Sequence, residues 1–470
     1  MRPKFNSQQE LDFNPSNLKV TNEYYARYEL ISQILNENPK IVNAVHQDLK
    51  KVYEADADKA KGPGGQDCDY SSETVLRMLI VKQIEGLTYR QATVRIDDSN
   101  FLRAFVGLLN GKMMDFTTLC KMFKAIRPET WEKINDLLTK YALEMEKITG
   151  EELRRDTTVY EANIHYPTDS SLLWDTYRKL DRFIEKVRET DPGLVGEQRL
   201  RIKDVKRIYF QISRQVSKNA DAEKSLKSAY RELIRHVEKI LIWTDEVCDV
   251  IRRTRTDYTW DVDAYLLGLV KEYEPFISLG IQVMDQASRR VLDGEQVPNA
   301  EKIFSIFEPH VELIKRGKAG KNVEFGHVVN LQQVREKFIT GYDVFEKKPV
   351  EHELVDPTLE RHVEVFGEYP EVYSDDKGAY ESMEKLYELE EKIPVVAICK
   401  KGKRNAEEEE REHSPAFKMA QKFRAGIEGS ISFLKRVLGL GKCFYRSFQT
   451  FKASVGSIVF AHNLLVLTRL

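Results

Sequence analysis

Hydrophobic positions follow a helical period through most of the first 150 residues. Apolar residues recur three and four positions apart, which places them on one face of a helix. This spacing predicts helices within residues 20–53, 70–80, 88–96, 101–109 and 127–148. The linker Lys59–Gly65 interrupts the series, because its glycines and proline cannot continue a helix. The short helices between residues 70 and 109 are compatible with a helix-turn-helix-like unit or with a plain helical bundle.

The pattern changes after residue 150. Thr157, Thr158 and Val159 favour a strand over residues 152–160, because their side chains are β-branched. From about residue 170 to 297 the chain is again helical and charge-rich, and it carries no recognisable motif. β-favouring segments then return between helical ones. Strands are expected at 322–330, 338–345, 371–374 and 394–398, and helices at 357–366 and 379–389.

Two charged runs and one apolar run complete the pattern. The basic stretch Lys315–Lys321 and the polar run Lys400–Glu412, with its block of four glutamates, are predicted to be loops. Further helices are expected at 413–436 and 451–467. The apolar run Gly456–Leu467 is too short to span a bilayer and contains His462 and Asn463. We therefore expect it to form a buried helix.

The composition is that of a folded protein with room for two or three domains in 470 residues. A hydrophobic content of 41% and a charged content of 31% argue against a disordered or a membrane protein. The net charge of −2 means that any nucleic-acid surface must be local. The five cysteines are scattered and lack CxxC spacing, which argues against a disulfide framework and a zinc site. Together with an N-terminus that lacks a signal peptide, this favours a cytoplasmic location.

Glu428 is the only acidic residue between Ser414 and Lys452, a segment that contains eight basic residues. At 100° per residue, Arg424, Glu428 and Lys435 lie within about 40° of one another on one helical stripe. One interpretation is an ion pair between Glu428 and Arg424, four residues apart. The other is a metal ligand beside a phosphate-binding surface. The spacing alone leaves both open.

The spacing Arg424-x3-Glu428-x6-Lys435, followed by the apolar tail SVGSIVFAHNLLVL, resembles the signature around the last acid of insertion-sequence DDE transposases. Two upstream segments match in the same order. LRRDTTV, which ends at Val159, resembles the strand of the first aspartate, and YSDDKGAY, which ends at Tyr380, resembles the turn of the second. The family signature usually opens with tyrosine three residues before the arginine, where this chain has glutamine.

The resemblance implies a mixed α+β and α/β fold. A ribonuclease H-like catalytic core would be preceded by a helical N-terminal domain and interrupted by a large helical insertion between its first and second strands. The implied boundaries are 1–148 for the N-terminal DNA-end-binding domain, 149–169 and 311–470 for the catalytic domain, and 170–310 for the insertion.

The resemblance also assigns the catalytic and metal-binding roles to Asp156, Asp376 and Glu428. Two Mg²⁺ ions about 3.5–4 Å apart neutralise the charge that develops during phosphodiester cleavage, and carboxylate oxygens are their preferred ligands. We therefore expect two Mg²⁺ ions per site, with Mn²⁺ able to substitute. Asp156 is alternatively an ordinary strand-end acid. Asp375 is the alternative to Asp376, although the family places its aspartate directly before a small or basic residue and a glycine.

Basic residues in three places are candidate DNA contacts. The family pattern assigns backbone contacts to the helix of the last acid, and it links the helical N-terminal domain to the ends of the element. The basic stretch before residue 322 suits a flexible phosphate-contacting loop or a solvated lead-in to a hairpin. The candidate residues are Arg424 and Lys435 on the Glu428 helix, Lys315, Arg316, Lys318 and Lys321 in the basic stretch, and Arg90 and Arg95 in the N-terminal domain.

The sequence therefore predicts a DNA transposase that binds terminal inverted repeats, cleaves the ends of an insertion sequence and joins them to target DNA. Because two ends must be held together, we expect a homodimer on DNA. We expect no membrane partner and no small-molecule substrate, and a cytoplasmic location at the nucleoid. Three alternatives remain: a domesticated DNA-binding protein without catalysis, a ribonuclease H-like nuclease, and a helical scaffold that works through the insertion.

Overall fold

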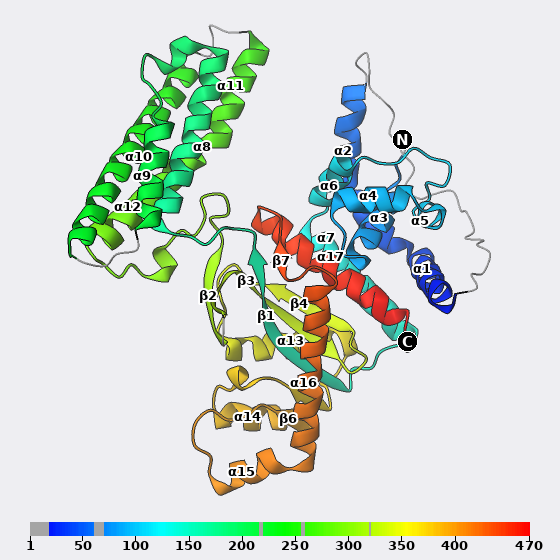
Figure 1. Ribbon diagram of the computed structural model, residues 1–470. Helices are drawn as coiled ribbons and strands as arrows, with labels where there is room; N and C mark the ends of the chain where they lie inside the picture. The colour runs from blue at the N-terminus through cyan, green and yellow to red at the C-terminus, as the bar shows by residue number, and fades with distance from the viewer. Residues whose placement is uncertain (1–17, 61–69, 216–219, 255–258, 319–320) are drawn as a thin grey trace. The chain divides into compact units, whose positions relative to one another are not determined.

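The computed structural model describes residues 18–60, 70–215, 220–254, 259–318 and 321–470, with the backbone alone at 55–60, 220, 316–318 and 321. The chain divides into two compact units (Figure 1). Unit 1 comprises Met1–Asn163 and Gly326–Leu470, and unit 2 comprises Ile164–Phe325. Each unit is described by itself below.

Seven helices form the N-terminal part of unit 1 in the described residues (Figure 1). They are α1 Lys19–Glu37, α2 Pro39–Ala60, α3 Ser72–Ile84, α4 Tyr89–Asp97, α5 Asn100–Phe105, α6 Phe116–Ala125 and α7 Pro128–Glu144. Side-chain hydrogen bonds cap the N-termini of α3 and α4. The Ser71 side chain accepts from the backbone N–H of Thr74, and Thr88 forms a capping box with Gln91. The apolar faces predicted from the helical period meet in one buried core.

A mixed sheet runs through the described residues. Its strands are β1 Glu152–Ala162, β2 Glu312–Lys318, β3 Lys321–Val334, β4 Ile339–Val344, β5 Val372–Ser374, β6 Val395–Ala397 and β7 Lys442–Cys443. β1 is central, because it pairs antiparallel with β3 and parallel with β5 and β7. β4 adds to β3 in antiparallel orientation, and β6 adds to β5 in parallel orientation. The strand order is β2-β3-β1-β5-β6, with β4 also paired to β3.

The rest of unit 1 consists of helices and 3₁₀ turns around this sheet. They are η5 Glu351–Leu354, α13 Val355–Phe366, η6 Lys377–Ala379, α14 Met383–Glu390, α15 Ala406–His413, α16 Pro415–Arg436 and α17 Phe448–Leu467. The mixed helical and sheet composition agrees with the predicted fold class at this general level.

Helix α17 is the core helix of unit 1. Among the described residues it is the one helix long and apolar enough to cross a membrane, but 89% of its most apolar stretch is buried inside the structure. Its two polar residues have partners: His462 Nε2 donates to the Lys337 carbonyl at 2.9 Å, and the Asn463 amide bonds both the N–H and the C=O of Ile339. The polar interruptions of the apolar run therefore bind α17 to the β3–β4 turn.

Two of the predicted loops were wrong. The polar run 400–412 forms α15 from Ala406 onward, because Asn405 and Glu408 make a capping box and Arg404 pairs with Glu412 at 2.7 Å. The basic stretch predicted as a loop forms most of β2 and the first residue of β3. Residues 319–320 of that stretch lie outside the described residues.

Unit 2 is a helical bundle with its own hydrophobic core (Figure 1). Its helices are α8 Asp169–Thr190, η1 Pro192–Val195, α9 Ile202–Arg214, α10 Ala220–Thr254, α11 Trp260–Tyr273, α12 Pro275–Ala287, η3 Ser288–Leu292 and η4 Asn299–Glu301. Within the region predicted to be helical from about residue 170 to 297, α11 and α12 are divided at Pro275, because proline cannot donate the hydrogen bond that would continue α11.

Candidate active site

Asp156 lies on β1, and Asp376 follows β5, the parallel neighbour of β1. The last paired residues of the two strands are Arg154 and Ser374, two positions before each aspartate. Burial raises the pKa of Asp156 to about 6, and the charge of Asp376 adds to this effect while Arg424 opposes it. The two carboxyl groups predicted from separate motifs therefore interact electrostatically.

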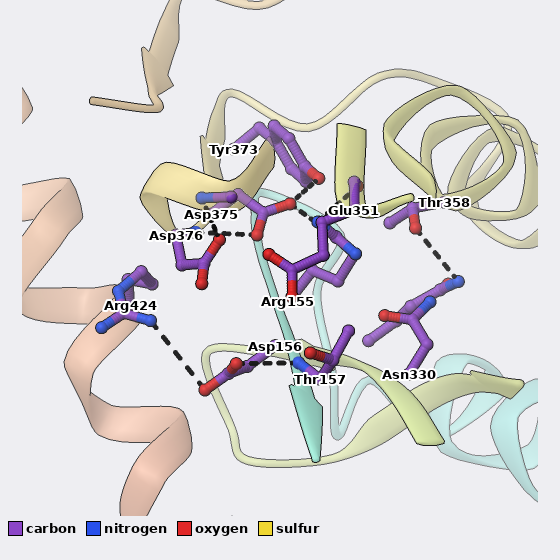
Figure 2. A network of polar contacts seen from close by, with 12 residues as sticks. Arg155, Asp156, Thr157, Asn330, Glu351, Thr358, Tyr373, Asp375, Asp376 and Arg424 are labelled. Atoms are coloured by element: carbon purple, nitrogen blue, oxygen red, sulfur yellow. Dashed lines mark hydrogen bonds and ion pairs between the residues drawn. The ribbon is translucent and has the colours of Figure 1, made fainter. Parts of the chain in front are cut away.

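Arg424 connects Asp156 to Glu428. Its guanidinium nitrogens lie 3.9 Å from Oδ2 of Asp156 and 3.4 Å from Oε1 of Glu428. The Thr157 backbone N–H donates to the other carboxyl oxygen of Asp156 at 2.7 Å and orients it. Figure 2 shows that the carboxyl groups of Asp156 and Asp376 face Arg424, which is a residue of α16. The Glu428 side chain is 66% exposed and pairs with Arg424, as the simpler interpretation of its spacing predicts.

Asp375 has the opposite environment from Asp376. Its Oδ2 accepts from Nε of Arg155 at 2.5 Å and from the Tyr373 hydroxyl at 2.6 Å, and both members of the ion pair are 1% exposed. The backbone N–H of Asp376 donates to its other oxygen at 2.7 Å. Arg155 also donates to the Glu351 carbonyl at 3.1 Å. The Asp375 carboxyl is therefore occupied by internal partners (Figure 2).

Glu351 places a fourth carboxyl group at the site (Figure 2). A Cβ on Gly378 would collide with Oε2 of Glu351 and would lie 2.7 Å from Oδ1 of Asp376. The same Oδ1 accepts the Gly378 N–H at 2.6 Å. Glycine at this position therefore lets the two carboxyl groups face each other. Sequence reasoning missed Glu351, because it lies in a charged stretch before α13 that carries no period or motif.

Helix α16 is fixed to β1 by Arg154. The Arg154 guanidinium donates to the Phe423 carbonyl at 2.6 Å and to Oε1 of Gln333, and it lies 4.6 Å from the centre of the Phe423 ring. Gly426 leaves room for it, since a Cβ there would collide with the guanidinium. Burial lowers the pKa of Arg154 to about 10, so it stays charged at neutral pH. Arg154 thus sets the position of the helix that carries Arg424 and Glu428.

Gln421 stands where the family signature has tyrosine. Its side-chain amide donates to the Ala397 carbonyl at 2.5 Å and to the Asp375 carbonyl at 3.3 Å. These are the carbonyls at the ends of β6 and β5. In this chain the position therefore links α16 to the ends of the two strands.

The other predicted DNA contacts lie on several elements. Arg95 of α4 forms an ion pair with Glu85 at 3.2 Å, and the Arg90 guanidinium lies 4.6 Å from the centre of the Phe116 ring. Both sets of contacts are within the N-terminal helices. Lys435 is half-buried on α16, two turns beyond Glu428, and Lys315 is exposed on β2 in unit 2. The side chains of Arg316, Lys318 and Lys321 lie outside the described part of the chain.

The carboxyl groups fit a magnesium site in part. Within the described ranges, no three His, Cys, Asp or Glu side chains converge closely enough to hold a metal ion by themselves. Magnesium, however, is usually held by one or two carboxylates together with water and substrate phosphates. Asp156 and Asp376 supply such a pair, and their mutual repulsion is an electrostatic cost that a bound cation would offset.

The N-terminal helices match a known family. Residues 23–125, from α1 to the end of α6, match the family model described as Transposase domain (DUF772). Over these residues the chain is similar to a transposase domain. This supports a DNA-processing enzyme with DNA as its partner. Neither the comparison with curated proteins nor the comparison with solved structures found a match.

Proposed function

We propose that this transposase is of the DDE type, with a ribonuclease H-like core and a site made of Asp156, Asp376 and Glu428. The strand arrangement supports the core assignment. The path β4-β3-β1-β5-β6 combines antiparallel strands on one side of β1 with parallel strands on the other, and α13 and α14 connect the strands in the second half. This is the arrangement that the resemblance to DDE transposases implies.

The observation that carries the proposal is the meeting of the three motifs. Asp156 comes from β1, Asp376 follows β5, and Arg424 and Glu428 come from α16. Arg424 of the third motif lies 3.9 Å from Asp156 of the first and also pairs with Glu428. The second motif affects the first through the pKa of Asp156. More than 260 residues separate the first acid from the last, so only the fold brings these motifs together.

In the proposed reaction, Asp156 and Asp376 would hold Mg²⁺, with Glu428 as a further ligand. When bound, Mg²⁺ ions neutralise the negative charge that develops on the phosphate oxygens during in-line displacement. The N–H groups of Thr157 and Gly378 fix one oxygen of each aspartate and leave the other available. Arg424 adds a fixed positive charge beside the acids, which suits a DNA phosphate at the cleavage point.

The same proposal includes the DNA substrates and the assembly. The protein would bind the terminal inverted repeats of an insertion sequence, hydrolyse the phosphodiester at each end and join the freed 3′-hydroxyl to target DNA. Two ends must be held at once, so we propose that it works as a homodimer on DNA.

The test is a cleavage and strand-transfer assay on DNA that carries the nucleotides flanking the gene, with Mg²⁺ or Mn²⁺. Asp156→Asn is expected to lower the cleavage rate by about a thousandfold or more while DNA binding is retained, because it removes a metal ligand and no DNA contact. Asp356→Asn is the matched control, since this exposed acid of α13 pairs with Lys385 outside the site. Chelation of divalent ions is expected to stop cleavage by the unaltered protein.

Other outcomes would identify the alternatives. Normal cleavage by Asp156→Asn would show that the catalytic assignment is wrong. Cleavage of DNA without inverted repeats would identify a nuclease. Specific binding of the ends without any cleavage by the unaltered protein would identify a DNA-binding protein that has lost catalysis.

A further inference from the structure

Among the α-helices of unit 2, α9 has an excess of basic residues. Helix α8 contains five acidic and five basic residues, and α10 contains seven of each. Helix α11 is acidic overall, with three acids and one base. Helix α9 and its N-cap Arg201 instead carry five basic residues and one acid, Asp204. Among the α-helices described in unit 2, α9 is therefore the basic one, and the others are of balanced or negative charge.

The basic residues of α9 lie on its exposed face. Val205, Ile208 and Ile212 bury the other face in the core of unit 2, next to α8 and α10 (Figure 1). The basic side chains exposed along α9 are Lys203, Lys206, Arg207 and Arg214. The one acid neutralises this face only weakly. Asp204 lies 3.7 Å from Arg201 and 3.8 Å from Arg207, and at 66% and 76% exposure these arginines are screened by water.

An exposed aromatic ring lies within this basic face. Phe210 is 41% exposed, although burial of its ring would be favourable. Lys206 Nζ lies 5.9 Å and Arg214 Cζ 5.5 Å from the centre of the ring, so two cations flank it. Its neighbour Tyr209 stacks on Trp174 of α8 with 5.9 Å between ring centres, which fixes this turn of the helix. Cations around an exposed aromatic ring are the combination that nucleic-acid surfaces use.

We propose that the exposed face of α9 binds the phosphate backbone of the DNA on which this transposase acts. The proposal rests on the proposed function in that it takes DNA as the substrate, but it uses none of the catalytic residues. Lys206 and Arg207 are the central phosphate contacts, with Lys203 and Arg214 on either side of them. Phe210 offers a stacking surface for an unpaired base next to the contacted phosphates. This gives the helical insertion a function in holding DNA.

The test measures the salt dependence of DNA binding by the full-length protein, using fluorescence anisotropy with a labelled duplex. The double variant Lys206→Ala with Arg207→Ala is expected to bind several-fold more weakly to duplexes of any sequence. The slope of log K against log salt concentration should fall by about two, because each phosphate contact contributes about 0.9. Alanine is a good helix former at exposed positions, so thermal melting should be unchanged.

A matched variant controls for net charge. Arg253→Ala with Lys271→Ala also removes two exposed positive charges from unit 2, and Arg253 is 80% exposed, close to the 76% of Arg207. The end of α9 lies at the start of α10, where Gln215 donates to the Ala222 carbonyl. Arg253 is 31 residues further along α10, about 45 Å at 1.5 Å per residue. This control is expected to bind DNA with an unchanged salt slope.

The possible results separate this proposal from the proposed function. Equal effects of the two double variants would overturn the α9 surface, because net charge alone would then explain them. An unchanged slope in the α9 variant would also overturn it, while the catalytic proposal would stand on the Asp156→Asn assay. A further variant, Phe210→Ala, should weaken binding to DNA with a single-stranded overhang more than binding to a blunt duplex. An equal loss of binding to the two DNAs in Phe210→Ala would show that the ring does not stack on an unpaired base.

Discussion

Asp375 and Asp376 are adjacent in the chain and have different roles in the structure. The Asp375 carboxyl is buried against Arg155 and Tyr373, and its ion pair holds the end of β5 to β1. The Asp376 carboxyl faces Asp156 and accepts only the Gly378 N–H among the described hydrogen bonds. We infer that Asp375 stabilises the turn and that Asp376 takes part in chemistry.

This division predicts opposite effects of two conservative substitutions. Asp375→Asn should lower the free energy of unfolding by about 3–5 kcal/mol, because it leaves the buried Arg155 charge without its partner. Asp376→Asn should change stability by less than about 1 kcal/mol, because asparagine still accepts the Gly378 N–H, and it should abolish cleavage. Chemical denaturation and the cleavage assay check both. A stable, inactive Asp375→Asn variant would reverse the assignment.

Sequence reasoning proposed the acids that lie in contiguous motifs and missed an acid whose position depends on the fold. Asp156, Asp376 and Glu428 each lie in a short segment that is similar to a family pattern, so they could be proposed from the sequence, and their roles remain predictions. Glu351 was not, because its position depends on the approach of η5 to Gly378. The burial of Arg155 was also not predictable, since an arginine in a strand is usually exposed.

At the scale of elements, most strands and helices with an apolar period were predictable, and strands β4, β5 and β6 and helices α4 and α7 lie within a few residues of their predicted positions. Helix α6 was missed, although its buried residues Leu119, Met122 and Phe123 are spaced like one face of a helix. Helix α15 was missed, because it is stabilised by side-chain caps and ion pairs and not by an apolar face. Helix α17 was predicted to be buried, and its two polar residues bind the β3–β4 turn.

The buried position of His462 on α17 predicts a loss of stability in acid. Burial, assisted by the charges of Arg469 and Lys337 and opposed by the hydrogen bond to the Lys337 carbonyl, lowers its pKa to about 4, whereas an unfolded histidine titrates near 6.5. Between pH 6.5 and 4 the unfolded chain therefore binds a proton that the folded chain does not. Titration of His462 therefore leaves the free energy of unfolding unchanged above pH 6.5. As the pH falls below 6.5 the free energy of unfolding decreases, by about 3 kcal/mol at pH 4 and below.

The measurement is the pH dependence of unfolding in the unaltered protein and in His462→Gln, whose amide can still donate to the Lys337 carbonyl. The variant should lose less stability between pH 6.5 and 4. His362, another buried histidine, also has a pKa lowered to about 4 by burial and is present in both proteins, so the difference reports on His462 alone. Parallel curves would show that His462 does not titrate in this window.

At the scale of the whole molecule, the two units have separate hydrophobic cores and are connected through one strand pair. β1 and β3 are antiparallel partners, and Glu161 stands opposite Gly326 where the chain leaves and re-enters unit 1. The general fold class was predictable from the change between helical and β-favouring segments. The boundaries of the three predicted domains remain predictions, because the helical N-terminal part and the sheet share one core through α17.

The strand pairing predicts that unit 1 folds without unit 2. Replacement of residues 162–325 by a two-residue Asn-Gly turn should leave a β1–β3 hairpin, because the flanking residues Glu161 and Gly326 are already opposite each other. The shortened protein is expected to melt cooperatively and to retain the ion pair of Arg155 with Asp375, which NMR of the Arg155 side chain can report. An aggregated or molten product would show that unit 1 requires unit 2.

The position of unit 2 within a hairpin also has a consequence for how the polypeptide folds. Closure of a flexible segment of about 160 residues costs about 3 kcal/mol more conformational free energy than closure of a four-residue turn. In folded unit 2, Tyr166 and Phe325 are neighbours, with 5.7 Å between their ring centres. Once the bundle has formed, strands β1 and β3 on either side of it in the chain are already held near each other, so early formation of the bundle would speed assembly of the sheet that carries the acids.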